Sequence, residues 1–240
     1  MSHKVNDLYN WFSQFNDRAI KIKSDNLNFE VNLNKRSLLH LIGVHYIFKN
    51  PKFLRGSDLI KEVINKGYDD KKIIGLIAKN NPHMVRSFKV RTKNLRPFLE
   101  NLENARLVEM TKNNTKLKSN YLAMQSKDKD LLLLGLVRND YEDYFETFII
   151  ENSDSYFKNT TINEPVKSIT EILDDGTEVP FSFSEEKQKQ YQLENNKSNQ
   201  IINKKTSFRD EMISWQEKAN DSNKTEININ KKDLDQGRDL

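Results

Sequence analysis

Cysteine is absent from the 240-residue chain, and glycine and proline are scarce, with seven and five residues. Without cysteine the protein has no disulfides, no thiolate zinc site and no cysteine nucleophile. The sequence also has no run of about 18 apolar residues, the length that a membrane-spanning helix requires. Its first residues, MSHKVNDLYNWF, lack the apolar core of a signal peptide. We therefore expect a soluble, cytoplasmic protein that does not associate with a membrane.

The usual motifs of nucleotide and metal chemistry are missing as well. The chain has no GxGxxG, no GxxxxGK(S/T), no HExxH, no GxSxG and no EF-hand loop. Its four histidines (His3, His40, His45 and His83) are scattered, and no cluster of carboxylates accompanies them. We expect neither a metal ion nor another cofactor.

Positive charge is concentrated in the first half of the chain, although the net charge is only +4. Residues 1–120 contain 23 Lys and Arg against 11 Asp and Glu, whereas residues 121–240 contain 16 against 24. The basic residues are densest from Lys71 to Lys118. Such a region suits a phosphate backbone, although an ordinary solvated surface in a chain rich in Lys and Asn explains it equally well.

Periodicity predicts an α+β fold, in which an N-terminal hairpin and helices precede an antiparallel sheet of about four strands. Residues 4–17 have helical spacing, and residues 19–33 alternate as a β-hairpin. Further helices are expected over 34–48, 57–67, 69–79, 83–93 and 95–103. Strands are expected over 105–112, 119–127, 131–139 and 146–152, with links short enough for an antiparallel meander.

The stretch LLHLIGVHYIF, residues 38–48, has apolar residues around its whole circumference, as in a helix buried inside a domain. In one continuous helix His40 and His45 point to nearly opposite sides. Gly43 lies one turn from His40 and would leave room there for a phosphate or a strand. On its own, His40 is more often a hydrogen-bonded core residue than part of a site, and His45 is assigned a structural role.

The strand LLLLGLVR is apolar on both faces, so it is predicted to be central in the sheet, with Arg138 at its end. In the next strand Phe145, Thr147 and Ile149 are predicted to share a face. We place the folded domain at residues 1–175. Residues 176–240 are expected to be a polar, largely disordered tail with one short amphipathic segment around Trp215.

A small set of polar residues at the edges of these apolar elements has the groups needed to cleave RNA by transesterification; its members are His40, Arg138, Glu146, Thr147 and Tyr156. In that reaction the 2′-hydroxyl of the RNA attacks the phosphorus. Histidine can act as acid or base, arginine binds phosphate through two N–H groups, and a hydroxyl donates to a phosphate oxygen. Each residue alone has an ordinary structural explanation, so only convergence on one cleft would be informative.

The run NFEVNLNKRSLLHLIGV, followed by LLLLGLVRN, YFETFIIENSDSYF and PVKSI, resembles the phage nucleases grouped with barnase, EndoU, colicin and RelE toxins. The similarity extends over residues 18–172. It implies a helix-then-sheet fold and metal-independent ribonuclease activity. In a phage or mobile-element setting it also implies a toxin or effector role. By position, His40 matches the motif histidine, Arg138 the basic residue after the strand, and Thr147 the hydroxyl of an ETFF-like strand, which here reads ETFI.

We therefore expect RNA as the partner, with a row of basic residues along its backbone: Arg36, Arg86, Lys89, Arg91, Lys93 and Arg96. The acidic tail is a candidate docking segment for a protein such as an antitoxin or another phage or host protein. Two other functions remain open. One is a nucleic-acid-binding protein without catalysis, and the other is an interaction or structural protein of a phage or mobile element.

Overall fold

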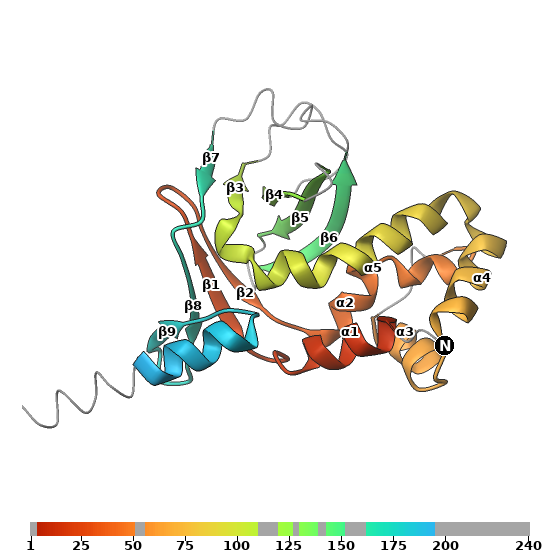
Figure 1. The fold of residues 1–240 in the computed structure, drawn as a ribbon, viewed down its shortest axis with the longest axis horizontal. Coiled ribbons are helices and arrows are strands. Elements are labelled where there is room, and N and C mark those ends of the chain that lie inside the picture. Colours follow the sequence, from red (N-terminus) through yellow and green to blue (C-terminus); the bar gives the residue numbers. More distant parts are fainter. Residues whose placement is uncertain are drawn as a thin grey trace, which may run out of the picture. The chain divides into compact units, whose positions relative to one another are not determined.

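A computed structural model describes residues 4–50, 56–109, 120–126, 130–138, 143–151 and 162–194. Helix α1 (Lys4–Ser13) precedes the hairpin of β1 (Ala19–Lys23) and β2 (Asn28–Asn32). The helical region follows with α2 (Lys35–Leu41), the 3-10 turn η1 (Val44–Ile47), α3 (Gly56–Leu59), the π-helical segment η3 (Ile60–Ile64), α4 (Asp70–Asn80), η4 (Pro82–Met84), α5 (Val85–Glu100) and η5 (Leu102–Asn104). The predicted mixture of helices and antiparallel sheets is confirmed (Figure 1).

The second half of the chain supplies the remaining strands. These are β3 (Arg106–Val108), β4 (Asn120–Gln125), β5 (Leu131–Val137), β6 (Tyr144–Glu151), β7 (Asn163–Pro165), β8 (Ser168–Ile172) and β9 (Glu178–Pro180). They complete two antiparallel sheets, with strand orders β2-β1-β8-β9 and β6-β5-β4-β3-β7. The N-terminal hairpin is therefore half of a four-stranded sheet whose other half comes from the end of the described chain.

The predicted meander β3–β6 is present, but β7 joins it beside β3. Strand β5 is an interior strand flanked by β4 and β6, and the middle of the five is β4 rather than β5. One face of this sheet packs on α5, where the rings of Phe98 and Phe148 meet with centroids 5.4 Å apart. Helix α5 is continuous over the stretch predicted as two helices, because Pro97 is accommodated within it.

The folded region continues beyond residue 175, so the predicted domain boundary lies too early. Strand β9 pairs with β8, and Phe181 and Phe183 are buried against Trp11, Phe12 and Phe15 of the N-terminal segment. Two phenylalanines in the segment VPFSF are enough apolar surface to anchor it in the core. The chain divides into two units, residues 1–188 and 189–240. The structure describes only 189–194 of the second unit, so the predicted tail segment around Trp215 lies outside the described residues.

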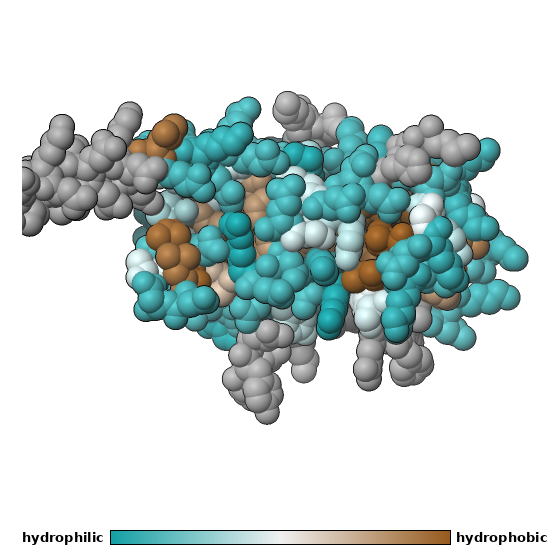
Figure 2. Space-filling model, turned by 90° about the horizontal axis from the view of Figure 1, so that it is seen from below, coloured by the Kyte–Doolittle hydropathy of each residue, from teal (hydrophilic) through white to brown (hydrophobic). Residues whose placement is uncertain are grey.

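The surface seen in Figure 2 is mainly hydrophilic, and its apolar side chains form small separate patches. None of the helices in the described ranges combines the length and the apolar character that a membrane crossing requires. Most of the buried apolar side chains belong to one large core, which contains residues of α1, of the other helices and of the strands of both sheets. The polar groups considered next lie at the border of that core.

Candidate functional site

The helix that carries His40 is interrupted at Gly43. Helix α2 ends at Leu41, Gly43 adopts a left-handed conformation with φ of 81°, and the chain continues as η1. The prediction of one helix from 34 to 48, with His40 and His45 on opposite sides, is therefore wrong. The turn brings the two imidazole rings together, with centroids 5.1 Å apart and an angle of 32° between the ring planes.

The space beside Gly43 is filled rather than open. A Cβ atom at this position would lie 3.2 Å from the ring of Tyr46 and 3.7 Å from Nη1 of Arg91. Glycine is needed here because a positive φ is unfavourable for other residues. Gly43 thus serves the turn that pairs the histidines, and the predicted room for a phosphate at this point is occupied by protein side chains.

His45 lies behind His40 and is uncharged at neutral pH. Burial, together with the charges of His40 and Arg91, lowers the pKa of His45 to about 4. Its Nδ1 atom is buried and has no hydrogen-bond partner among the described residues. Its ring also packs on Tyr46, with centroids 4.0 Å apart. A buried polar atom without a partner is rare in folded proteins and is a marker of functional sites.

Arg91 completes this group from α5. Its exposed fraction is 9%, so it is not part of the exposed row of cations in which the sequence placed it. Burial lowers the pKa of the Arg91 guanidinium, and interaction with Tyr46 partly opposes that effect. Within the described part of the chain it forms no ion pair with a carboxylate, and its Nε is buried without a partner. Arginine is seldom buried unless it is paired.

His40 itself lines a cavity of about 500 Å³, which we call the His40 cavity. Arg36, Ser37 and His40 lie on one side of α2, at the spacing that places residues one turn apart. Asp17 and Tyr144 line the same cavity, together with Asn32 at the end of β2 and with Leu33 and Asn34 of the segment between β2 and α2. The cavity thus contains an imidazole, a guanidinium, a carboxylate and a phenol.

Local structure holds the cavity wall in place. The side chain of Asn34 caps α2 as predicted, because it accepts a hydrogen bond from the Arg36 N–H at 2.9 Å. Ser37 Oγ donates to the Asn34 carbonyl at 2.7 Å, so this hydroxyl is already engaged. Gly56 begins α3 directly against α2, and a Cβ there would lie 2.2 Å from the Arg36 carbonyl oxygen. Only glycine allows this close approach of the two helices.

Asp17 is a residue of the cavity that the sequence did not indicate. It is the one residue other than glycine with a positive φ (65°) in the described ranges. Its backbone N–H donates to the Leu33 carbonyl at 2.8 Å, and its carboxylate accepts a hydrogen bond from the Asn16 side chain at 2.6 Å. A backbone conformation of this kind is uncommon and is often found at functional sites.

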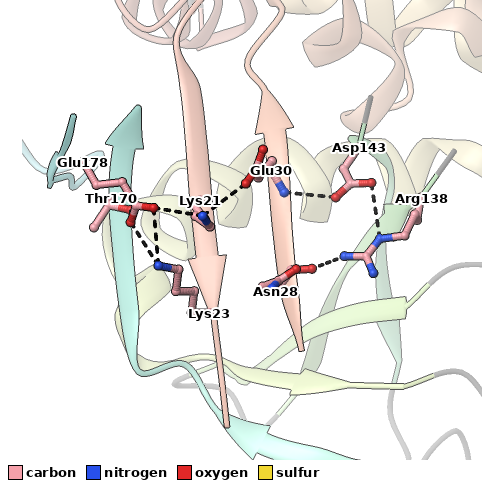
Figure 3. A network of polar contacts seen from close by, with 8 residues as sticks. All are labelled: Lys21, Lys23, Asn28, Glu30, Arg138, Asp143, Thr170 and Glu178. Atoms are coloured by element: carbon pink, nitrogen blue, oxygen red, sulfur yellow. Dashed lines mark hydrogen bonds and ion pairs between the residues drawn. The ribbon is translucent and has the colours of Figure 1, made fainter. Parts of the chain in front are cut away.

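Arg138 is placed elsewhere, at the junction of the two sheets (Figure 3). Its guanidinium donates to the Asn28 carbonyl, forms an ion pair with Asp143 at 3.6 Å, and lies 4.5 Å from the centre of the Phe29 ring. Asp143 is 8% exposed and also accepts the Glu30 N–H at 3.0 Å. We call this pair the Arg138–Asp143 clamp, because it fastens β2 to the segment between β5 and β6.

Glu146 and Thr147 lie at an irregularity of β6. Leu134 pairs with Phe148 and Leu136 with Phe145, so both residues stand opposite Gly135 in a β-bulge. Phe145 and Phe148 therefore both face the core, and the prediction that Phe145 and Thr147 share a face is wrong. Neither Glu146, which is exposed, nor Thr147 is among the described residues that line the His40 cavity. Tyr156 lies outside the described residues.

The remaining predicted nucleic-acid contacts lie mostly on α5. Arg86, Lys89, Lys93 and Arg96 are exposed, and Arg36 is exposed at the rim of the His40 cavity. Arg96 is engaged by Glu100 at 2.8 Å and packs over Trp11 at 4.9 Å. Of the predicted site, the structure thus brings His40 and Arg36 to one cavity, with Arg91 buried behind the paired histidines.

Sequence reasoning missed His45, Tyr46, Asp17 and Asp143. A glycine inside an apolar helical pattern was the available signal for the turn that pairs the histidines. Nothing in the local sequence marks Asp17 or Asp143, because the cavity around Asp17 and the contact of Asp143 with Glu30 involve residues far away in the chain.

Residues 4–189 match the family described as phage-Barnase-EndoU-ColicinE5/D-RelE like nuclease4. The matched region includes both sheets and every described residue of the His40 cavity. No curated protein and no solved structure shows a significant match to the chain.

Proposed function

The chain belongs to the phage-Barnase-EndoU-ColicinE5/D-RelE like nucleases, and on that premise we propose that it is a metal-independent endoribonuclease. The observation that supports this function best is the His40 cavity. An imidazole, a carboxylate and a guanidinium face the same space there, and these groups can supply proton transfer and charge stabilisation without a metal ion.

In the proposed reaction the 2′-oxygen of the RNA forms a bond to phosphorus while the bond from phosphorus to the 5′-oxygen breaks. A base takes the proton of the 2′-hydroxyl, and an acid protonates the leaving 5′-oxygen. The products are a 2′,3′-cyclic phosphate and a 5′-hydroxyl. His40 and Asp17 form the acid–base pair, because they supply the imidazole and the carboxylate that line the cavity.

Arg36 holds the scissile phosphate in this proposal, the role that the sequence assigned to Arg138. Its side chain is exposed one turn from His40, whereas the guanidinium of Arg138 is already bound in the clamp. Tyr144 can donate its hydroxyl to a phosphate oxygen, the function expected of Thr147. The buried charge of Arg91, behind the histidine pair, favours the negative charge that develops on the phosphorane in a region of low dielectric constant.

The decisive experiment is cleavage of labelled RNA by the full chain in EDTA, with end-group analysis of the fragments. We expect 2′,3′-cyclic phosphate ends, and a decrease of about a thousandfold in rate for His40→Ala, within the range for loss of a general acid or base. His83→Ala is the matched control, since His83 is exposed on η4 and outside the cavity. Unchanged cleavage by His40→Ala, or cleavage that EDTA abolishes, would contradict the proposal.

A toxin or effector role follows from the same activity. Induced expression of the chain should arrest growth of the host cell, and His40→Ala should relieve the arrest. If both proteins arrest growth equally, the effect does not come from the nuclease. If the chain binds RNA in a salt-dependent manner and cleaves none, it is a nucleic-acid-binding protein that uses the exposed cations of α5.

A further inference from the structure

A second and larger cavity lies between the C-terminal half of α5 and the adjoining ends of β4 and β5. Its volume is about 770 Å³, which falls in the range of small-molecule sites. We call it the α5–β4 cleft. None of its described lining residues lines the His40 cavity, so it is a separate site.

One wall of the α5–β4 cleft is apolar and rigid. It is formed by Pro97, Phe98, Met124 and Leu132. Phe98 is 1% exposed and is held by its edge-to-face contact with Phe148, and Leu132 is 4% exposed. A wall of this kind suits the flat face of an aromatic ligand.

Side-chain amides in defined orientations flank the apolar residues of α5 in this lining. The Nδ2 group of Asn94 donates to the Val90 carbonyl, and that of Asn101 donates to the Pro97 carbonyl, each at 2.9 Å. Both bonds are within α5, and they leave the Oδ1 atoms as hydrogen-bond acceptors. No donor to either oxygen is found among the described residues. Gln125 and Ser126 add further polar groups at the end of β4.

A ligand with a flat apolar face and amino groups on its edge complements this arrangement. Asparagine pairs with the edge of adenine in nucleic-acid complexes. Single-stranded RNA is recognised through bases that leave the stack and are held between apolar surface and polar side chains. Adenine and cytosine carry an exocyclic amino group, and uracil does not. The described lining contains no carboxylate that would repel the phosphates of such a ligand.

The α5–β4 cleft lies close enough to the His40 cavity for one RNA strand to reach both. Leu132 of β5 lines the α5–β4 cleft, and Val137 of the same strand pairs with Tyr144, which lines the His40 cavity. Five residues of extended chain span roughly 17 Å, a separation that a few nucleotides can cover. We propose that the α5–β4 cleft binds an unpaired nucleobase with an exocyclic amino group, in the RNA whose scissile phosphate lies at His40. The statement that this RNA is also the cleaved substrate rests on the proposed function.

The test measures binding by the full chain carrying His40→Ala, so that no RNA is consumed. Fluorescein-labelled heptamers of adenosine, cytidine and uridine are titrated and followed by anisotropy. We expect the adenosine and cytidine heptamers to bind about tenfold more tightly than the uridine heptamer, within the discrimination of one to two base-edge hydrogen bonds. Equal affinity for all three heptamers would overturn the base site.

Substitution then locates the preference. Asn94→Leu together with Asn101→Leu should reduce it to within about twofold, with little change for the uridine heptamer. Asn10→Leu on the exposed face of α1 is the matched control. A preference that survives the double substitution would place recognition elsewhere, and the thermal unfolding of each variant shows that it is folded. If the wild-type chain cleaves no RNA but the preference is present, the proposed nuclease fails and the base site stands. The reverse result rejects the base site alone.

Discussion

Arg91 and Arg138 are both arginines that the sequence marked as functional, and their surroundings are opposite. Arg138 is exposed, yet its guanidinium is engaged by a backbone carbonyl, a carboxylate and an aromatic ring. Arg91 is 9% exposed and has no carboxylate partner in the described chain. The exposed arginine is therefore committed to the fold, whereas the buried one carries a charge that no described carboxylate neutralises.

The comparison shows that the exposure of an arginine does not tell whether its guanidinium is available to bind a ligand. A buried charge costs folding free energy unless it is paired, so an unpaired one is retained for a reason other than stability. The Arg138–Asp143 clamp is the paired case, in which a nearly buried carboxylate has a cation and a backbone N–H as partners. Arg91, beside Tyr46 and the histidine pair, is the other case, since no described carboxylate pairs with it, and this group borders the His40 cavity. The following predictions test this contrast.

The largest effect is expected from pH. The pKa of His45 is near 6.5 in an unfolded chain and about 4 in the folded protein. Between these values the unfolded chain binds a proton that the folded protein does not, so stability is complete above about pH 6.5 and falls as the pH approaches 4. The loss attributable to His45 is about 3 kcal/mol. Urea unfolding at pH 7, 6, 5 and 4 measures it.

His45→Gln isolates that contribution, because glutamine does not titrate. The difference in unfolding free energy between pH 7 and pH 4 should be smaller by about 3 kcal/mol in the variant. Carboxylates such as Glu178, whose pKa is lowered to about 2 by its hydrogen bonds with Lys21, Lys23 and Thr170, contribute equally to both proteins. Parallel pH profiles for the two proteins would show that His45 is not buried in its neutral form.

The next prediction separates the two exposed arginines by activity. Arg36→Met should lower kcat/KM for RNA by about a hundredfold, the usual cost of removing one charge-stabilising donor. Arg138→Met should leave kcat/KM within about threefold at a temperature where the protein is folded, because its side chain acts on the fold. Initial rates of both variants on one RNA decide the matter. A larger loss of kcat/KM for Arg138→Met than for Arg36→Met would assign phosphate binding to Arg138.

The Arg138–Asp143 clamp should contribute measurably to the free energy of unfolding. Asp143→Ala removes the partner of Arg138 and of the Glu30 N–H, so we expect a loss of about 2 kcal/mol in unfolding free energy. A double-mutant cycle with Arg138→Met measures the coupling between the two residues, which should be about 1 kcal/mol. Additive effects would mean that the ion pair does not fasten the sheets.

The smallest effect has an unusual sign. Arg91→Met removes a buried guanidinium and fills its place with an apolar side chain, so the unfolding free energy should stay constant or rise by about 1 kcal/mol. Cleavage should fall at the same time, since the buried charge is lost. A decrease in stability of several kcal/mol would show instead that Arg91 has a neutralising partner and belongs to the same class as Arg138.

Much of the fold follows from local pattern. Alternation over residues 19–33 and 120–151 predicts the hairpin and the meander, and Asn34 predicts the start of α2. The pairing of β1 with β8 does not follow, because it joins residues that no local pattern relates. The burial of Phe181 and Phe183 is missed for the same reason, since two apolar residues in a polar segment give no periodicity.

The candidate site is recovered in part, and the failures have definite causes. His40 and Arg36 are one turn apart in a single helix, so their convergence is a local property. The helical pattern treats Gly43 as one more helical residue, which reverses the side on which His45 lies. Arg138 and Thr147 were selected by their position at strand edges. The clamp and the β-bulge that decide their surroundings depend on residues of other strands.

The pairing of β1 with β8 has a consequence for the time at which the protein becomes active. Ile20 stands opposite Glu171, so the sheet that contains the N-terminal hairpin is completed only by residues made long after the hairpin. Contacts so distant in sequence form slowly, and a chain still on the ribosome lacks them. The segment from β2 to α2, one side of the His40 cavity, therefore gains its full support only after β8 has been made and has paired with β1. The wall of the His40 cavity is therefore assembled late, and any activity of that cavity begins only after β8 is in place.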